Sequence, residues 1–508
     1  MSTRSMGAAA GRGPDREYPT RRTVVAGAAA LSVSVAAART ARALPAPSAA
    51  PALTDLERAL LSRATFGWTA EDAQQLATLG HETWLRTQLV PSSIDDSALD
   101  ARLAAYDWIP MTGPEMYDHP TLSPWEIAQE GRSVRLLRAT YSKRQLLERI
   151  VEFWTDHFNI FGQTGDTDVL KQVDDREVVR RHALGSFRDL LHASAKSPAM
   201  LHYLDNDTNE VGAPQENYAR EVMELHTLGV DGPYTESDVR ELARCFTGWT
   251  YYPVWQLNVG GTFRFRADRH DDGAKTVLGI PIPPGGGQQD GETVLDLLAS
   301  HPNTAARIAR KMCVFFLDYE PAQTTVDRVA ARFLETDGDL RETLREVLSR
   351  ASFEEIDVWS AKKLRRPMHM ALGAVRSTGA SVAAAVGLAG ELQLMGHAPF
   401  TWAAPNGFPD ALGAWGTNLL PRWSFASRLT AGGVPGALLP LSSLSQLFAG
   451  VPANRRAAQL DRALTGGRMA PADVTELQAF LDAQPTVDVN VAREAVALAL
   501  SLPSTQWL

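Results

Sequence analysis

The sequence predicts a mainly α-helical protein, with a single large helical domain and a small β-hairpin insertion. Hydrophobic residues make up 44% of the 508 residues and charged residues 21%, which is the composition of an ordinary globular chain. Apolar residues recur at helical spacing over most of the chain from Leu53 onward. Cys245 and Cys313 allow at most one disulfide and supply no Cys-x-x-Cys motif, so the fold must depend on apolar burial.

Residues 1–43 have the pattern of a twin-arginine signal peptide. Arg21 and Arg22 precede an uncharged stretch over residues 24–38, and Ala41-Arg42-Ala43 provides a small-residue cleavage site. The uncharged stretch is shorter than the roughly 20 residues that span a bilayer. We therefore expect export through the twin-arginine (Tat) translocon to the periplasm or the exterior, with a linker over residues 44–52 and no membrane span in the mature chain.

Removal of residues 1–43 would make the chain more acidic. The segment carries seven arginines and two acidic residues, so its loss changes the formal net charge from -9 to -14. Binding to the phosphates of nucleic acids requires clustered Lys and Arg side chains. The charge balance therefore argues against a nucleic-acid partner.

The helical pattern is clearest over residues 145–158, where Ile150, Trp154 and Phe158 fall on one face together with Leu147 and Val151. The same pattern predicts helices over residues 176–191, 187–203, 304–316, 324–334, 340–348, 361–375 and 491–502. Strand patterns are few. Residues 262–266 and 276–280 flank a polar turn and are the candidates for the small hairpin.

Two Gly- and Pro-rich stretches interrupt the helical pattern. Residues 280–291 (IPIPPGGGQQDG) are expected to be a loop, and no Gly-Lys-Ser/Thr follows that would make this a phosphate-binding loop. Residues 431–440 separate the main helical part, residues 53–430, from a C-terminal helical part of the same domain, residues 431–508.

A D-x-D-x-N segment suggests a metal site. Asp205, Asp207, Asn209 and Glu216 occupy positions 1, 3, 5 and 12 of a calcium-type loop, so Ca²⁺ or another divalent metal is a candidate cofactor. Position 6 of such a loop normally requires Gly for its sharp turn, but here it is Glu210. A polar loop whose side chains cap helix ends remains the alternative.

The next segment carries carboxylates suited to acid–base chemistry. Asn217, Glu221 and Glu224 lie at i, i+4 and i+7, so on a helix they share one face beside apolar residues. Two carboxylates close together in a partly desolvated site should differ in pKa, which an acid/base pair requires. Ion pairing of Glu216 with Arg220 would explain some of these charges without any catalytic role.

Two further catalytic candidates have structural alternatives. Thr235 and Asp238 have the spacing of a helix-capping box, which leaves Glu236 free for another role. His157 continues an apolar series and is either a histidine at the edge of the core or a catalytic or ligand residue beside Asp156.

Several segments from about Leu53 to the C-terminus match a known family. They are LLSRATFGWT (60–69), FWTDHF (153–158), ALGSFRDLL (183–191), SPAMLHYLD (197–205), ENYAREVMELHTLGV (216–230), YTESDVRELARCFTGW (234–249), HDDGAKTVLG (270–279) and NGFPD (406–410). In these segments the chain resembles the bacterial family of domain of unknown function 1800 (DUF1800) proteins. The resemblance implies a mostly helical, exported protein, often encoded beside a member of the domain of unknown function 1501 (DUF1501) family, whose fold is similar to sulfatases and alkaline phosphatases. It implies no particular reaction.

Three functions are compatible with these patterns. A secreted hydrolase or lyase would use a carboxylate pair drawn from Glu221, Glu224, Asp205 and Glu236 on a polysaccharide. The same oxygens would alternatively hold a divalent metal. A non-enzymatic partner or maturation factor of a DUF1501-type protein is the third possibility. Exposed tryptophans would suit sugar stacking, although Trp is more often a core residue.

Overall fold

The computed structural model describes residues 51, 53–162, 165–356, 363–440, 444 and 446–508, and Ala41–Leu508 form one compact unit. The predicted signal peptide, and the predicted linker apart from residue 51, lie outside the described residues. The prediction of a mainly helical protein is confirmed, with 60% helix and 5% strand. The sheets are small and two-stranded.

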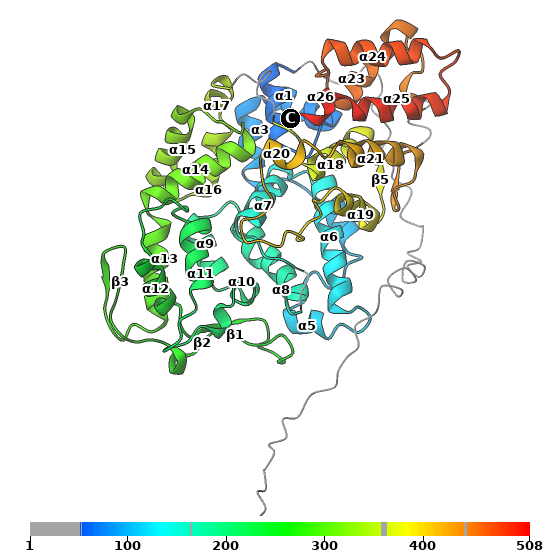
Figure 1. Ribbon diagram of the computed structural model, residues 1–508. Helices are drawn as coiled ribbons and strands as arrows, with labels where there is room; N and C mark the ends of the chain where they lie inside the picture. Colours follow the sequence, from blue (N-terminus) through cyan, green and yellow to red (C-terminus); the bar gives the residue numbers. More distant parts are fainter. Residues whose placement is uncertain (1–50, 52, 163–164, 357–362, 441–443, 445) are drawn as a thin grey trace, which may run out of the picture. The chain divides into compact units, whose positions relative to one another are not determined.

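The N-terminal half is built from helices of one to five turns (Figure 1). They are α1 (Asp55–Ala64), α2 (Ala70–Leu79), α3 (His81–Gln88), η3 (Pro91–Ser93), α4 (Ser97–Leu103), α5 (Gly113–Tyr117), α6 (Pro124–Tyr141), α7 (Gln145–His157), α8 (Thr167–Asp174), η4 (Asp175–Arg180), α9 (Phe187–Ala195), α10 (Pro198–Tyr203), η5 (Asn206–Thr208), α11 (Glu216–Glu221), η6 (Val222–His226) and α12 (Glu236–Cys245). Among these, η4 and η6 are π-helices, whereas η3 and η5 are 3₁₀-helices.

The remaining elements lie between Trp249 and Gln506. They are β1 (Trp249–Tyr251), β2 (Phe263–Phe265), η7 (Ala267–Arg269), β3 (Lys275–Val277), β4 (Ile280–Ile282), α13 (Gln288–Ala299), α14 (Pro302–Phe316), α15 (Gln323–Glu335), α16 (Leu340–Val347), α17 (Arg350–Glu354), α18 (Pro367–Thr378), β5 (Ser381–Val382), α19 (Val386–Leu394), α20 (Leu412–Trp415), α21 (Leu419–Ala431), β6 (Ala437–Leu438), η8 (Ala453–Arg455), α23 (Arg456–Thr465), α24 (Pro471–Asp482), α25 (Val489–Ser501) and α26 (Pro503–Gln506).

Capping side chains stabilise the first turn of several helices. The predicted capping box is confirmed at α12, where the Thr235 hydroxyl accepts from the Asp238 backbone N–H and the Asp238 carboxylate accepts from the Thr235 N–H. Thr54 with Glu57 at α1 and Ser123 with Glu126 at α6 make the same arrangement.

Two predicted helices are interrupted. The prediction over 176–191 breaks at Gly185 and Ser186, because Ser186 caps the new helix α9 by accepting from the Asp189 N–H. The prediction over 187–203 divides because Pro198 begins α10. Residues 361 and 362 of a third prediction lie outside the described residues, and its helix, α18, begins only at Pro367.

The predicted hairpin pairing is wrong. Residues 263–265 and 275–277 are strands, but β2 pairs with β1 and β3 pairs with β4, each antiparallel. Residues 280–282 therefore form a strand and residues 288–291 begin α13, so the loop predicted over 280–291 is shorter than expected. Leu278 and Gly279, both with positive φ (52° and 76°), form a two-residue turn, so β3 pairs with the strand that directly follows it and not with β2.

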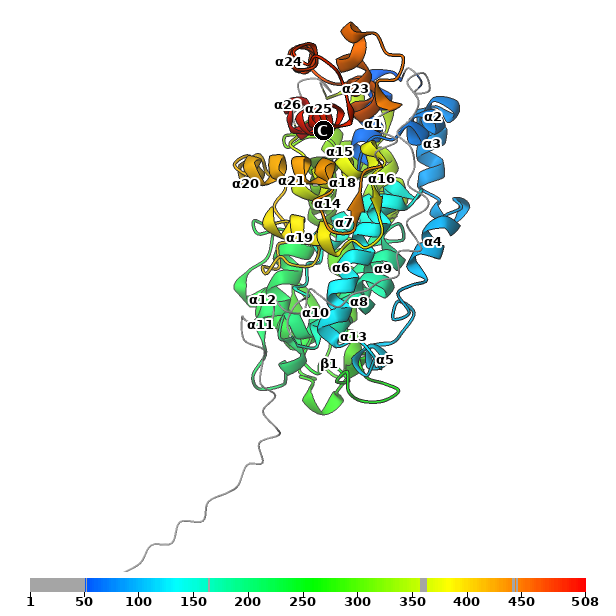
Figure 2. The same cartoon turned by 90° about the vertical axis from the view of Figure 1, so that its right-hand side faces the viewer.

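The core passes through α7, which Figures 1 and 2 show among α6, α14 and α18. Ile150 and Trp154 on this helix are fully buried, and so are the thiols Cys245 and Cys313, which are both free. In both views α23–α26 lie beside α1 at one end of this unit, and β1 and β2 lie at the other. No helix in the described part of the chain is both long and apolar enough to cross a membrane.

Candidate active site

The predicted carboxylate stripe lies where an α-helix changes to a π-helix. Helix α11 ends at Glu221, and the wider turns of η6 carry Glu224. The Glu224 carboxylate lies 3.5 Å from Nη1 of Arg220, four residues earlier in the chain. π-Helical turns inside helices occur frequently at functional sites.

Glu221 and Glu236 have different surroundings. The Glu221 carboxylate is half-buried and makes no hydrogen bond or ion pair with any described residue, and burial together with Glu224 raises its pKa. The Glu236 side chain is 70% exposed and forms an ion pair with Arg220 at 2.7 Å. Arg220 hydrogen bonding holds the pKa of Glu236 below its usual range, so this carboxylate stays ionised.

His157 lies in the core. Its Nε2–H donates to the His226 carbonyl (3.0 Å), so its Nδ1 accepts from Lys311 Nζ (2.8 Å). Burial and Lys311 hold the pKa of His157 well below its usual range, and burial lowers that of Lys311 to about 7. No hydrogen bond or ion pair between described residues joins His157 to Glu221, Glu224 or Glu236.

The residues of the predicted calcium loop are engaged with the protein. Asn209 is buried, and its amide donates to Ala243 O (2.9 Å) while its Oδ1 accepts from the Gln215 N–H (2.9 Å). Asp207 lies 3.4 Å from His202, and Glu216 pairs with Arg220 at 3.3 Å. Asp205 directly precedes η5, and its backbone is in the left-handed region (φ 59°).

Through these contacts, the predicted calcium loop connects α10 with α12. Among the residues described, no group of three or more His, Cys, Asp or Glu side chains is placed to hold a metal ion. The capping alternative therefore accounts for Asn209, whose carbonyl oxygen would otherwise be a metal ligand.

Replacing Asn209 by Ala is expected to lower the free energy of unfolding by about 1–3 kcal/mol, because it leaves buried backbone groups without partners. If the loop has this structural role, millimolar Ca²⁺ and chelator leave the melting temperature of the wild-type chain unchanged. Glu210→Gln, at the exposed position 6, is the control and should melt like wild type. A Ca²⁺-dependent rise that Asn209→Ala abolishes would contradict the structural role.

Sequence reasoning missed a buried charge network on α7. Arg366, which precedes α18, donates to Glu152 (2.5 Å) and to Asp156 (2.7 Å), two residues one turn apart. Arg149 donates to Glu152 (2.6 Å), and so does His369 Nε2 (2.8 Å). The side chains of Arg149, Glu152 and Arg366 are at most 5% exposed.

This network separates the acidities of the two carboxylates. Burial opposes ionisation of Glu152, but His369, Arg366 and Arg149 hold its pKa well below the usual range. Burial raises the pKa of Asp156 to about 6 although Arg366 opposes the shift, and the charge of Glu152 adds to it. A pair of carboxyl groups with pKa values driven apart is typical of acid–base sites.

Asp156 borders a small slot. The slot has a volume of about 20 Å³, which is room for about one water, and Asn159, His397 and Phe400 also line it. His397 Nδ1 accepts from the Met368 N–H (3.2 Å), so the neutral ring carries its proton on Nε2. Burial holds the pKa of His397 well below its usual range, which keeps the ring neutral.

The loop over residues 397–411 closes the slot against α7. Phe400 has a φ of 62°, a backbone conformation that is rare for a large side chain and is often found at functional sites. Gly407 has a φ of 72°, and a Cβ there would come within 2.0 Å of the Asp156 carbonyl oxygen. Only glycine therefore lets this loop approach α7 so closely.

Tyr203 connects the slot with Glu221. The Asn159 amide donates to Trp402 O (3.0 Å) and Ala404 O (2.7 Å), and the Tyr203 hydroxyl donates to Ala403 O (2.6 Å). Burial and the nearby Glu221 carboxylate raise the pKa of Tyr203 to about 12, and Asn159 hydrogen-bonds the phenol. Tyr203 therefore interacts both with Glu221 and with Asn159, a residue that lines the slot at Asp156.

The fold and this site define a mainly helical protein with a carboxylate-bearing slot above a buried charge network. The sequence matches the family described as "Protein of unknown function (DUF1800)" over residues 59–507, and the chain belongs to this family. Comparisons with curated proteins and with solved structures gave no match.

Proposed function

We propose that the chain is an exported acid–base hydrolase or lyase that acts on polysaccharide, with Asp156 and Glu221 as its carboxyl pair. The observation that carries the proposal is the slot beside Asp156, whose carboxyl has a pKa near 6, and its link through Asn159 and Tyr203 to the unpaired carboxylate of Glu221. The pair differs from the Glu221–Glu224 pair expected from spacing. Glu224 instead tunes Glu221 by its negative charge.

In hydrolysis Asp156 is the general acid, because burial raises its pKa to about 6 and it therefore holds a proton in mild acid. It protonates the glycosidic oxygen as the bond from that oxygen to the anomeric carbon breaks. Glu221 is the general base: it takes a proton from a water whose oxygen forms the new bond to the anomeric carbon. One proton is thus given and one taken, so Asp156 ends ionised and Glu221 ends protonated, and proton exchange with the solvent restores both for the next turnover.

The polysaccharide class is supported by Trp402. Its backbone carbonyl accepts from the Asn159 amide, and its partly exposed ring packs against Phe408. The ring Nε1–H donates to Asn406 (2.9 Å), which fixes the ring plane. A fixed aromatic face beside polar side chains suits a sugar ring, whose one side is apolar and whose edge carries hydroxyls.

Asp156→Asn and Glu221→Gln are each expected to reduce turnover about 10²-fold, since general acid or base catalysis contributes at least that much. Glu221→Gln should keep the wild-type unfolding midpoint. Asp156 pairs with the buried Arg366, so the turnover of Asp156→Asn is compared at a temperature where its unfolding curve shows that it is folded. The assay measures reducing ends released from a panel of neutral and acidic polysaccharides. Activity should fall above about pH 6, where Asp156 loses its proton.

Glu224→Gln is the informative companion variant. Removing that negative charge lowers the pKa of Glu221, so the base stays ionised to lower pH and the acid limb of the profile moves down. Glu236→Gln, which alters only an exposed ion pair, is the matched control and should keep the wild-type profile. Full activity of Asp156→Asn on a substrate that the wild-type chain cleaves would refute the assignment.

A second candidate function is that of a partner or maturation factor for a DUF1501-type protein. The loop between β1 and β2 exposes Trp255 (64%), Leu257 (71%) and Val259 (37%), an apolar group that a binding partner would cover. Co-purification of the two exported proteins from their native host is the observation that would favour this function.

A further inference from the structure

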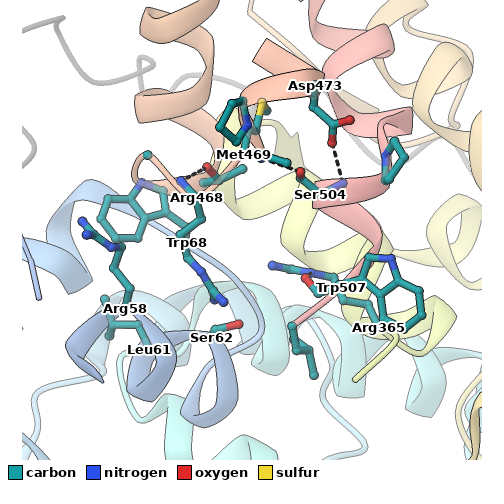
Figure 3. A pocket seen from close by; sticks show the side chains of 16 residues that line it. Arg58, Leu61, Ser62, Trp68, Arg365, Arg468, Met469, Asp473, Ser504 and Trp507 are labelled. Atoms are coloured by element: carbon teal, nitrogen blue, oxygen red, sulfur yellow. Dashed lines mark hydrogen bonds between the residues drawn. The ribbon is translucent and has the colours of Figure 1, made fainter. Parts of the chain in front are cut away.

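A larger cavity lies between α1, the segment before α18 and the C-terminal helices. Its volume is about 570 Å³, and Arg58, Arg365 and Arg468 line it, so we call it the arginine pocket. The three arginines come from α1, from the residues preceding α18 and from the loop between α23 and α24. Figure 3 shows Arg365 and Arg468 reaching toward one another into this pocket.

Two of the three positive charges have no carboxylate partner among the described residues. Arg58 pairs with Asp55 at 2.9 Å. Arg365 Nε donates to the Trp507 carbonyl (3.0 Å), but no described acid pairs with its guanidinium. The Arg468 side chain makes neither a hydrogen bond nor an ion pair with the residues described.

The acid in the pocket wall is already engaged. Asp473 Oδ2 accepts from the Ser504 N–H (2.8 Å), as the dashed line in Figure 3 marks. Burial and then Arg468 lower the pKa of Arg365 to about 10, and burial and Arg58 lower that of Arg468. Like charges are therefore held close together here, within a chain whose net charge is negative.

Buried polar atoms in the same wall lack partners as well. In the part of the chain that the structure describes, Ser62 Oγ, Trp68 Nε1 and Arg58 Nε have no hydrogen-bond partner. All three can donate, and buried donors are rarely left unpaired. Leu61, Met469 and Trp507 supply apolar surface beside them.

We propose that the arginine pocket binds a small organic anion, whose carboxylate or phosphate oxygens lie between Arg365 and Arg468. Guanidinium groups bind the oxygens of either anion in pairs. The unpaired donors of Ser62 and Trp68 complete the ligand's polar contacts, and its apolar body packs against Trp507. This binding site is separate from the slot at Asp156 and does not depend on the proposed catalytic function.

Titration calorimetry with phenyl phosphate and with benzoate tests the proposal, and benzyl alcohol serves as the neutral probe of similar size. At least one anion is expected to bind and the alcohol is not. Binding should weaken from 50 to 500 mM NaCl, because charge carries it. Inorganic phosphate should bind more weakly than phenyl phosphate, since it lacks the apolar body.

Arg468→Gln is expected to reduce anion affinity at least tenfold without lowering the unfolding midpoint, because the Arg468 side chain makes no hydrogen bond or ion pair with a described residue that the change would break. Arg462→Gln, on the exposed side of α23, is the control and should bind like wild type. Equal affinity of wild type and Arg468→Gln, or no heat with either anion, would overturn the proposal.

Discussion

Glu152→Gln is expected to lower the free energy of unfolding by about 3–5 kcal/mol. The substitution leaves Arg149 and Arg366 buried with too little negative charge, and breaking a buried ion pair from one side is costly for that reason. The measurement is urea unfolding at pH 7, compared with Glu177→Gln. Glu177 makes exposed ion pairs on η4, so that variant should stay within about 1 kcal/mol of wild type.

A double substitution distinguishes this cause from simple loss of packing. Arg149→Met in the Glu152→Gln background removes one of the unbalanced charges and should recover part of the lost stability. If the two changes are additive instead, the charges are not coupled, and the role assigned to the network is wrong.

Mild acid is expected to destabilise the chain strongly. Burial is the main cause that lowers the pKa of four histidines, to about 3 for His226 and His369 and well below the usual range for His157 and His397. Because the folded pKa lies below the unfolded value of about 6.5, the unfolded state alone takes up these protons as pH falls from 6.5. Each histidine then lowers the free energy of unfolding by about 1.4 kcal/mol per pH unit.

Carboxyl groups oppose part of this loss. Asp156, with its pKa raised to about 6 by burial, takes up its proton first in the folded state and so stabilises the fold between pH 6 and 4. Asp168, with a pKa also near 6, acts the same way but is partly exposed, so its effect is smaller. With both effects included, the free energy of unfolding should fall by about 2 kcal/mol or more per pH unit between pH 6 and 4.

His226→Leu is the variant that checks this origin. Neither ring nitrogen of His226 has a partner among the described residues, so the substitution removes a titrating group without removing a hydrogen bond. Its unfolding free energy should fall about 1.4 kcal/mol less per pH unit than that of wild type. His301→Asn, which keeps a capping side chain at the start of α14, should retain the wild-type slope. An unchanged slope in His226→Leu would contradict the explanation.

Features that depend on neighbouring residues could be predicted from the sequence. The helix over 145–158 and the capping box at Thr235 and Asp238 follow from contacts within one or two turns, and both are present. The sequence pattern missed the pairings of β2 and β3 and the π-helical turn at η6. Residues 280–282 begin a Gly- and Pro-rich stretch that the pattern assigns to a loop, so the pairing of β3 with β4 across Leu278 and Gly279 is not predicted.

The candidate site could also be predicted only in part from the sequence. Glu152 and Asp156 are four residues apart on a correctly predicted helix, so their shared face was visible in the sequence. Their different acidities depend on Arg366 and His369, more than 200 residues later in the chain. In a sequence alone, charged residues on one side of a helix are typical of a solvent-exposed face. Only the structure shows the distant residues that bury them here.

The two buried thiols have a practical consequence. Burial raises the pKa of both Cys245 and Cys313 to about 12, and neither is bonded to the other. An alkylating reagent can therefore modify them only when the surrounding helices, α12 or α14, separate. Since the two cysteines lie on different helices, the rate of modification at each one measures how often that part of the native protein opens.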